Sequence, residues 1–276
     1  INYLFVFFSF ICIISFSQDL FNSQSIYDTE GELFDWGEVR DININFYDTD
    51  YDSFLIQSWF DNTKLTLPAS IDIDGEYFDS VAVRYKGNST FYIPYTLGNP
   101  KKPYNIDFND YDSNQDFMGY NKIKLANTLF DPTCRKEILG YSIYRNYLPS
   151  PQANFMNLYV NNDLLGLYVN TEAINFSFLD KHFGESDGAF FKCENQDLFG
   201  VSGGSLTPNL DYRGMDSTLY IESYELKSES GFKALMDMIY TLNNDIDNIE
   251  DYLNVDRALW YMAVNSCILN ADTYSL

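Results

Sequence analysis

Histidine and cysteine are scarce in this chain of 276 residues. It contains one histidine, His182, and four cysteines, none of them in a C-x-x-C pair. Zinc sites need Cys or His ligands at short spacings, so no zinc centre is predicted. His182 falls at the end of a predicted helix, where histidine usually has a structural role, which disfavours a histidine-based metal site or Ser–His hydrolysis. Beyond residue 17, Cys134, Cys193 and Cys267 allow at most one disulfide in an oxidising compartment.

Basic residues are also few. The chain has 17 Lys and Arg against 40 Asp and Glu, a formal net charge of −23. Nucleic acid and anionic membranes would be repelled by such a surface, so we expect neither as a partner. The acidity suits the solubility of an exported protein.

Long apolar runs are absent except at the start, where residues 1–17 are INYLFVFFSFICIISFS. The run has the length of a signal-peptide core, with small residues before Gln18 that fit a cleavage site. It is short for a membrane anchor and Ser9 interrupts it, although a retained anchor is the alternative. We therefore expect a secreted or cell-surface protein without stable membrane insertion. Because the chain begins at Ile1 and ends at Leu276 in an apparent loop, we also expect a fragment.

The remaining chain is predicted to be a short linker, residues 18–31, followed by one domain, residues 32–276. Hydrophobic content of 46%, with 23 Tyr and 23 Phe, supports a large aromatic core. Alternating patterns predict early strands, an Asp74-Gly75 hairpin turn and a second hairpin around residues 161–163. Expected strands are 39–46, 65–74, 77–86, 104–108 and the two arms of 155–172. Expected helices are 48–60, one capped by Asp131 with Pro132 in its first turn, 173–182, 232–242, and 255–269 capped by Asn254. Residues 109–116 form an acidic loop of disordered character.

A β-rich half followed by a helix-rich half predicts an α+β, two-lobed architecture. The N-terminal lobe would span about residues 32–172 and the C-terminal lobe would begin at 173.

Two segments between Val83 and Phe108 contain residue types that can bind a phosphate. In the turn KGNST, Gly87 permits tight backbone geometry, and hydroxyl residues follow, so successive amides can face a phosphate. Lys101 and Lys102 then open the strand that begins at Tyr104. Each feature is commonplace by itself, because polar turns end many strands and flanking lysines are usually solvated.

The order of the parts is more specific. A polar glycine turn, a strand lysine, the helical carboxylate Glu137, a hairpin and a helical region occur in this order in kinase-type phosphotransferases. Asp272, in NADTYS, stands where such enzymes place a catalytic-loop carboxylate, although it also suits a simple helix cap.

The chain resembles the CotH kinase family, which is named for a spore coat protein and has an atypical protein-kinase-like fold. The matching segments run from about Phe34 to the end of the chain. They are VAVRYKGNST, KKPYNIDF, the block from NKIKLANTLFDPTCRKEILGY to GLYVNTE, DGAFFKCE, and VDRALWYMAVNSCILNADTYS. The middle block is the most specific, because its Asp-Pro, Arg-Lys-Glu, Pro-x-Pro and Gly-Leu-Tyr elements fall in the family's order.

The resemblance implies transfer of phosphate from ATP to serine or threonine of a protein substrate, with Mg²⁺ or Mn²⁺. By position, it implies that Asp272 is catalytic. It implies that ATP is bound by Lys86, Gly87, Asn88 and Ser89 in the turn, by Lys102, by Glu137 as the partner of that lysine, and by Glu172 at the lobe junction. For Glu172 a structural role at a helix start is an equal alternative, and Pro103 departs from the small hydroxyl residue often found there.

The family continues past this point to a metal-binding aspartate that would lie beyond Leu276. We therefore expect a metal site that is incomplete in this sequence and little activity from these residues alone.

Two other interpretations remain open. One is a non-catalytic extracellular surface or assembly protein with the same fold, which an acidic, aromatic-rich chain would suit. The other is calcium binding by the acids at 48–52 or 110–116, neither of which has the Gly and Glu spacing of an EF-hand loop.

Overall fold

The structure is a computed structural model that describes residues 26–27, 29–193 and 208–270. The predicted signal segment and Asp272 lie outside these ranges. Within them, no helix has both the length and the apolar character that crossing a membrane requires.

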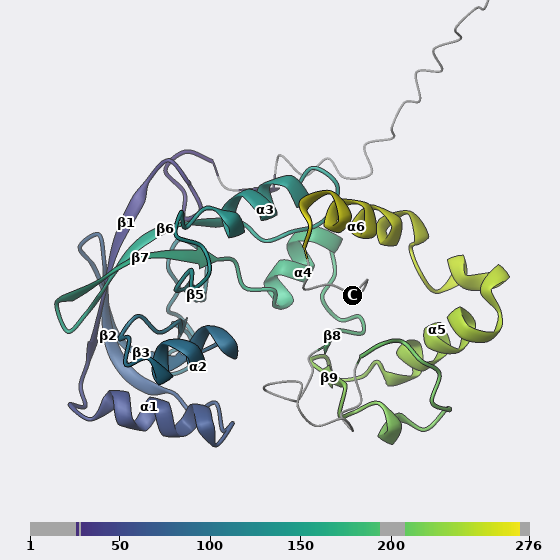
Figure 1. Cartoon of the computed structure of the whole chain (residues 1–276), viewed down its shortest axis with the longest axis horizontal. Coiled ribbons are helices and arrows are strands. Elements are labelled where there is room, and N and C mark those ends of the chain that lie inside the picture. Colours follow the sequence, from purple (N-terminus) through teal and green to yellow (C-terminus); the bar gives the residue numbers. More distant parts are fainter. Residues whose placement is uncertain (1–25, 28, 194–207, 271–276) are drawn as a thin grey trace, which may run out of the picture.

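Seven strands form a closed barrel in the order β1-β2-β3-β4-β5-β7-β6 (Figure 1). Strands β1 and β6 close the barrel by pairing in parallel, and every other pair is antiparallel. The bounds are β1 (Val39–Phe46), β2 (Leu67–Ile73), β3 (Glu76–Tyr85), β4 (Tyr104–Asp107), β5 (Lys122–Ala126), β6 (Ala153–Val160) and β7 (Asp163–Thr171).

Alternation along the strands decides which side chains fill the barrel. Successive side chains point to opposite faces, so the apolar positions of each strand meet in one core. Its fully buried members include Ile42, Ile44, Ile71, Val81, Val83, Ile106, Ile123, Leu125, Met156, Leu158 and Tyr168. The intervening polar positions therefore point outward, to the outer face of the barrel.

Helices occur both between the barrel strands and after the barrel. They are α1 (Tyr51–Phe60), α2 (Ser89–Thr96), α3 (Lys136–Tyr144), α4 (Phe176–Phe183), α5 (Phe232–Asn244) and α6 (Val255–Ile268), with short 3-10 helices η2 (Ser217–Leu219) and η3 (Ile246–Asp251). A two-stranded sheet of β8 (Phe191–Cys193) and β9 (Tyr224–Leu226) precedes α5. In Figure 1 the barrel lies on the left and α5 on the right, with α4, α6, β8 and β9 between them.

Two further contacts organise the helical part. A second core gathers Tyr220 and Tyr224 with Leu235, Met236 and Ile239 of α5. Helix α6 packs beside α3, where the Tyr147 and Trp260 rings stack with centroids 4.7 Å apart and Tyr144 donates to Asn265.

The α+β class predicted from the sequence is confirmed. The β6–β7 hairpin turns at Asn161 and Asn162 as predicted, and both residues have positive φ, which asparagine tolerates. The α6 cap is also confirmed, because the Asn254 side chain accepts from the Arg257 amide at 2.9 Å.

Several local predictions were wrong. Asp131 does not begin a helix: its carboxylate accepts from the amides of Thr133 and Lys136, and α3 starts at Lys136. The polar turn after β3 is shorter than expected, because α2 begins at Ser89. Residues 109–116 are not disordered but form turns, in which Asp112 accepts from the Asn114 amide. Strand β5 was not predicted at all.

The disulfide that the sequence allowed does not form, since Cys134, Cys193 and Cys267 are all free thiols.

Candidate functional site

Lys102 is buried just before β4 and is held by a carboxylate from helix α1. Its Nζ donates to Asp52 Oδ1 on α1 at 2.9 Å, and it lies 5.3 Å from the centre of the Tyr85 ring. The Tyr85 hydroxyl donates to the same oxygen at 2.6 Å. Lys102 is 8% exposed, so its ammonium is neutralised by Asp52 and largely removed from water.

The sequence predicted Glu137 as the partner of Lys102, but in the structure that partner is Asp52. Glu137 Oε1 accepts from Thr171 Oγ1 at 2.6 Å, which joins the first turn of α3 to the end of β7. Its charge acts instead on Lys86, where it opposes the lowering of the pKa by burial. Glu137 therefore acts through its charge on Lys86, which follows β3, and the two form no ion pair.

Outward positions of β3, β4 and β5 place several cations together. The register aligns Arg84 of β3 with Asn105 of β4, and Asn105 with Lys124 of β5. Lys86 lies two positions beyond Arg84, and Lys122 lies two positions before Lys124. We call these four basic residues, Arg84, Lys86, Lys122 and Lys124, the cationic row. In an acidic chain, such a concentration of positive charge on one face needs an explanation.

The cationic row is only partly neutralised. Lys122 forms an ion pair with Asp107, next to it on β4. Among the described residues, neither the Lys86 nor the Lys124 ammonium has an ion-pair partner. Burial, followed by the charge of Lys86, lowers the pKa of Lys124 to about 8, and burial also lowers the pKa of Lys86. The charge of Lys192 on β8 also reaches Lys124. An anion would relieve this electrostatic strain.

The predicted glycine turn lies directly after Lys86. Gly87 has φ +78°, and a Cβ there would overlap Thr90 Oγ1. Its carbonyl accepts from Trp59 Nε1 at 2.7 Å, while Asn88 and Ser89 are exposed at the start of α2. The buried Asn127 carboxamide donates at 2.8 Å to the carbonyls of Thr90 and Lys101, so it ties both ends of this segment to the end of β5.

Glu172 is buried where β7 leaves the barrel. It accepts from the Gln152 amide at 3.0 Å and from Lys181 Nζ of α4 at 2.9 Å. These contacts fix the connection from barrel to α4. Glu172 also lines a cavity of about 480 Å³, to which Lys122, Asn175, Phe178 and Lys181 contribute.

The expected catalytic carboxylate, Asp272, lies outside the described residues. Within them, no group of three or more His, Cys, Asp or Glu side chains is arranged to hold a metal ion, so the acids at 48–52 and 110–116 form no such site. Any metal bound near the cationic row would need ligands from elsewhere.

A sequence profile of the family described as CotH kinase protein matches residues 83–276, well over half of the chain. The chain belongs to the CotH kinase family. The match begins on β3, just before Arg84, and therefore contains the whole cationic row. Membership indicates a kinase-like phosphotransferase and suggests the use of ATP and a protein substrate. A search of curated proteins found no match.

Sequence reasoning missed Lys124, and it named Asp52 only among the acids considered for calcium, not as the partner of Lys102. Lys124 lies on β5, whose signal is the short alternation of Lys122 and Lys124 with Ile123 and Leu125 in NKIKLAN. That alternation predicts a half-buried strand with both lysines on one face. Asp52 offered no such signal, because its partner Lys102 is distant in sequence.

Proposed function

We propose that this CotH family member is an exported protein kinase that transfers the γ-phosphoryl group of ATP to serine or threonine of a protein. The proposal rests on the cationic row, in which the ammonium groups of Lys86 and Lys124 have no ion-pair partner among the described residues. A row of this kind suits a polyphosphate, since phosphate oxygens would supply the missing negative charge.

The proposed architecture has two lobes. The barrel would be the N-terminal lobe, the helical region from residue 173 would be the C-terminal lobe, and the phosphates would lie between the cationic row and β8. The cavity beside Glu172 has room for a nucleoside, and Lys122 of the cationic row lines it. The exposed turn of Gly87, Asn88 and Ser89 would cover the phosphates with its amides.

In the proposed chemistry, the acceptor hydroxyl attacks the γ-phosphorus as the bond to the β,γ-bridging oxygen breaks, which releases ADP. Asp272 would orient the hydroxyl and take its proton. Lys86 and Lys124 would stabilise the charge on the phosphate oxygens, and the charge of Glu137 would favour the charged form of Lys86. A bound Mg²⁺ or Mn²⁺ would neutralise further phosphate charge.

Nucleotide binding by the 276-residue chain tests this proposal. We expect ATP with Mn²⁺ to raise the thermal midpoint of the parent chain. Lys86→Met and Lys124→Met should each weaken ATP binding at least tenfold, because each removes a phosphate contact. Lys233→Met, which changes a lysine 82% exposed on α5, is the matched control and should bind as the parent does.

Phosphotransfer is the second readout. Phosphoamino-acid analysis of a mixed protein substrate, with a chain extended beyond Leu276, should show phosphoserine or phosphothreonine, and Asp272→Ala should abolish it. If ATP neither raised the thermal midpoint of the 276-residue chain nor served as phosphate donor for the extended chain, the kinase proposal would be overturned in favour of a non-catalytic surface protein.

A further inference from the structure

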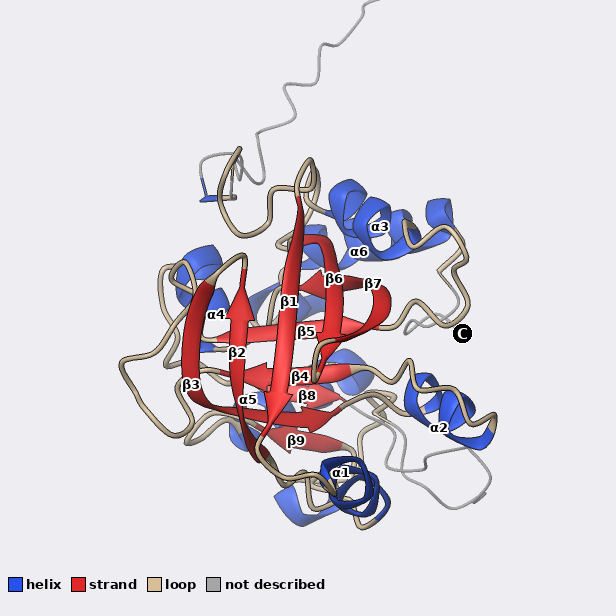
Figure 2. Ribbon diagram, turned by 90° about the vertical axis from the view of Figure 1, so that its left-hand side faces the viewer, coloured by secondary structure: helices blue, strands red, loops and turns tan. Residues whose placement is uncertain are grey.

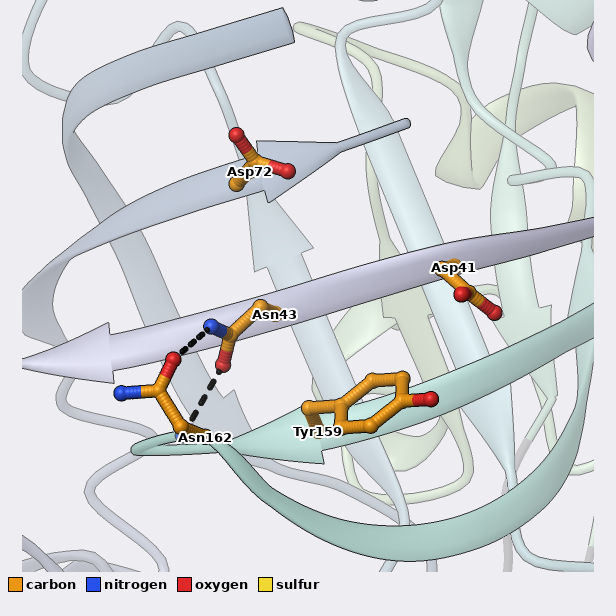
Figure 3. A pocket seen from close by; sticks show the side chains of 5 residues that line it. All are labelled: Asp41, Asn43, Asp72, Tyr159 and Asn162. Carbon is orange, nitrogen blue, oxygen red and sulfur yellow. Dashed lines mark hydrogen bonds between the residues drawn. The ribbon is translucent and has the colours of Figure 1, made fainter. Parts of the chain in front are cut away.

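A shallow polar pocket of about 310 Å³ lies on the outer face of β2, β1 and β6 (Figure 3). In the strand order, β1 stands between β2 and β6, on the wall of the barrel away from β4 and β5, and Figure 2 shows β4 and β5 behind it. The pocket is therefore separate from the cationic row. Its lining residues are Asp41, Asn43, Asp72, Tyr159 and Asn162.

Strand register arranges these side chains in a line. Asp72 of β2 pairs with Asn43 of β1, and Asn43 pairs with Tyr159 of β6. The line continues onto β3, where Tyr77 pairs with Asp72. Tyr77 is 63% exposed, so its ring is open to contact with a ligand. A tyrosine thus stands at each end of the line, about 14 Å apart across three strand spacings.

The pocket is organised in advance by hydrogen bonds. Asn43 Nδ2 donates to Asn162 Oδ1 at 2.8 Å, and the Asn162 amide donates back to Asn43 Oδ1 at 3.3 Å. Asn157 Nδ2 fixes Asp41 by donating to its Oδ1 at 2.8 Å. Asn162 is further held by the tight β6–β7 turn, in which its φ is +70°. Such fixed polar groups lose little entropy when a ligand binds.

Hydrogen-bonding capacity remains on the same side chains. In the described part of the chain, no hydrogen bond engages Oδ2 of Asp41, Oδ2 of Asp72, the Tyr159 hydroxyl or Nδ2 of Asn162. The two carboxylate oxygens only accept, the carboxamide nitrogen only donates, and the hydroxyl does both. A ligand that fits must therefore offer both donors and acceptors.

Charge narrows the ligand class. The carboxylates of Asp41 and Asp72 disfavour a phosphate or another anion. A bare metal ion is disfavoured because the pocket holds only two carboxylates, and the described residues contain no metal-binding group of three. Carbohydrate hydroxyls both donate and accept, and the C–H face of a sugar ring packs on tyrosine. We propose that this wall of the barrel binds a neutral oligosaccharide that extends from Tyr159 towards Tyr77.

Affinity electrophoresis of the 276-residue chain tests the site, using native gels that contain hydroxyethylcellulose, arabinoxylan, galactomannan or glycol chitin. Calorimetry with oligomers of the retarding polymer then gives the affinity. We expect at least one polymer to retard the parent. Tyr159→Ala and Tyr77→Ala should each bind about tenfold more weakly, because each removes an aromatic platform. Tyr252→Ala, at a tyrosine 52% exposed outside this wall, should bind as the parent does.

Asp72→Asn keeps the shape of the pocket and replaces the alanine variants as the test if one of them fails to fold. It should also weaken polymer binding, because it removes a strong acceptor. Failure of all four polymers to retard the parent would overturn the proposal. So would equal binding by the parent and the Tyr77 and Tyr159 variants, or a calcium-induced rise in thermal midpoint that Asp72→Asn removes while no polymer binds. ATP with Mn²⁺ should raise the thermal midpoint of Tyr159→Ala as much as that of the parent. The test of oligosaccharide binding is therefore independent of the proposed kinase activity.

Discussion

The ammonium of Lys102 and the carboxylate of Asp52 are joined at 2.9 Å, although the two residues are 50 positions apart in the sequence. The pair ties the start of β4 to helix α1, and the Tyr85 hydroxyl donates to the same carboxylate oxygen. A lysine engaged in this way has a structural role that is complete without a ligand. Its predicted contact with phosphate therefore stays a prediction that a substitution must test.

Lys102→Met should lower the free energy of unfolding by about 1–2 kcal/mol, since the pair is buried only on the lysine side and Asp52 stays hydrated. If Lys102 is structural, ATP affinity at the cationic row should remain within about threefold of the parent. Urea unfolding and ATP titration measure the two effects. Asp52→Asn is the comparison: it should destabilise the chain similarly. A large loss of ATP binding in a folded Lys102→Met variant would restore Lys102 as the phosphate ligand.

The strands show how far the sequence could be interpreted. Alternation in VRDININF predicted a strand in which Ile42 and Ile44 are indeed buried, because burial of one face imposes a period of two, although Val39 of the same apolar set is exposed. The hairpin predicted over 155–172 is present as β6 and β7. Closure of the barrel was not predictable this way, because the parallel β1–β6 pairing joins residues more than a hundred positions apart. The same reason explains the wrong partner for Lys102. Residue type and order suggested a lysine–glutamate pair, but only the fold decides that Lys102 meets Asp52 and that the charge of Glu137 acts on Lys86.

Lys124→Met should make the chain more stable at pH 7 while it weakens nucleotide binding. Burial and the charge of Lys86 lower the Lys124 pKa from 10.5 to about 8, so the charged form is less favourable folded than unfolded. Replacement by an apolar side chain of similar length should therefore raise the free energy of unfolding at pH 7, by about 1 kcal/mol after allowance for solvent. Urea unfolding measures this, and a loss of stability would contradict it.

The same substitution should change the pH dependence of stability. Between pH 8 and 10.5, the unfolded chain keeps the Lys124 proton while the folded chain has lost it, so raising the pH in this window favours the folded state. The advantage of Lys124→Met over the parent should accordingly shrink as the pH rises from 8 to 10. An advantage that is constant with pH would show that packing, and not charge, explains it.

Gly87→Ala should be more destabilising than Gly98→Ala. Both glycines have positive φ, +78° and +64°, which costs alanine about 1 kcal/mol in either place. Only at Gly87 does the added Cβ overlap another atom, Thr90 Oγ1, whereas at Gly98 nothing lies within 4 Å. The difference between the variants in urea unfolding therefore isolates the cost of the clash, for which we expect at least about 1 kcal/mol. Adding Thr90→Ala to Gly87→Ala should recover most of it; equal losses in the two single variants would show that the segment after Gly87 moves freely.

His182 should make acid destabilise the chain between pH 6.5 and 4. Burial, and secondarily the charge of Lys181, lower its pKa from 6.5 to about 4, and its ring lies 4.1 Å from that of Phe178. In this window the unfolded chain binds a proton on His182 that the folded chain does not, so the free energy of unfolding decreases as the pH is lowered. His182→Gln should reduce that fall by about 1–2 kcal/mol in urea titrations at pH 7 and 4.5, an amount discounted because the imidazole is only half-buried. Since His182 is the only histidine, its ring proton gives the pKa directly by NMR. A midpoint at or above 6.5 would contradict the burial of a neutral ring, and the acid sensitivity would then belong to the carboxylates.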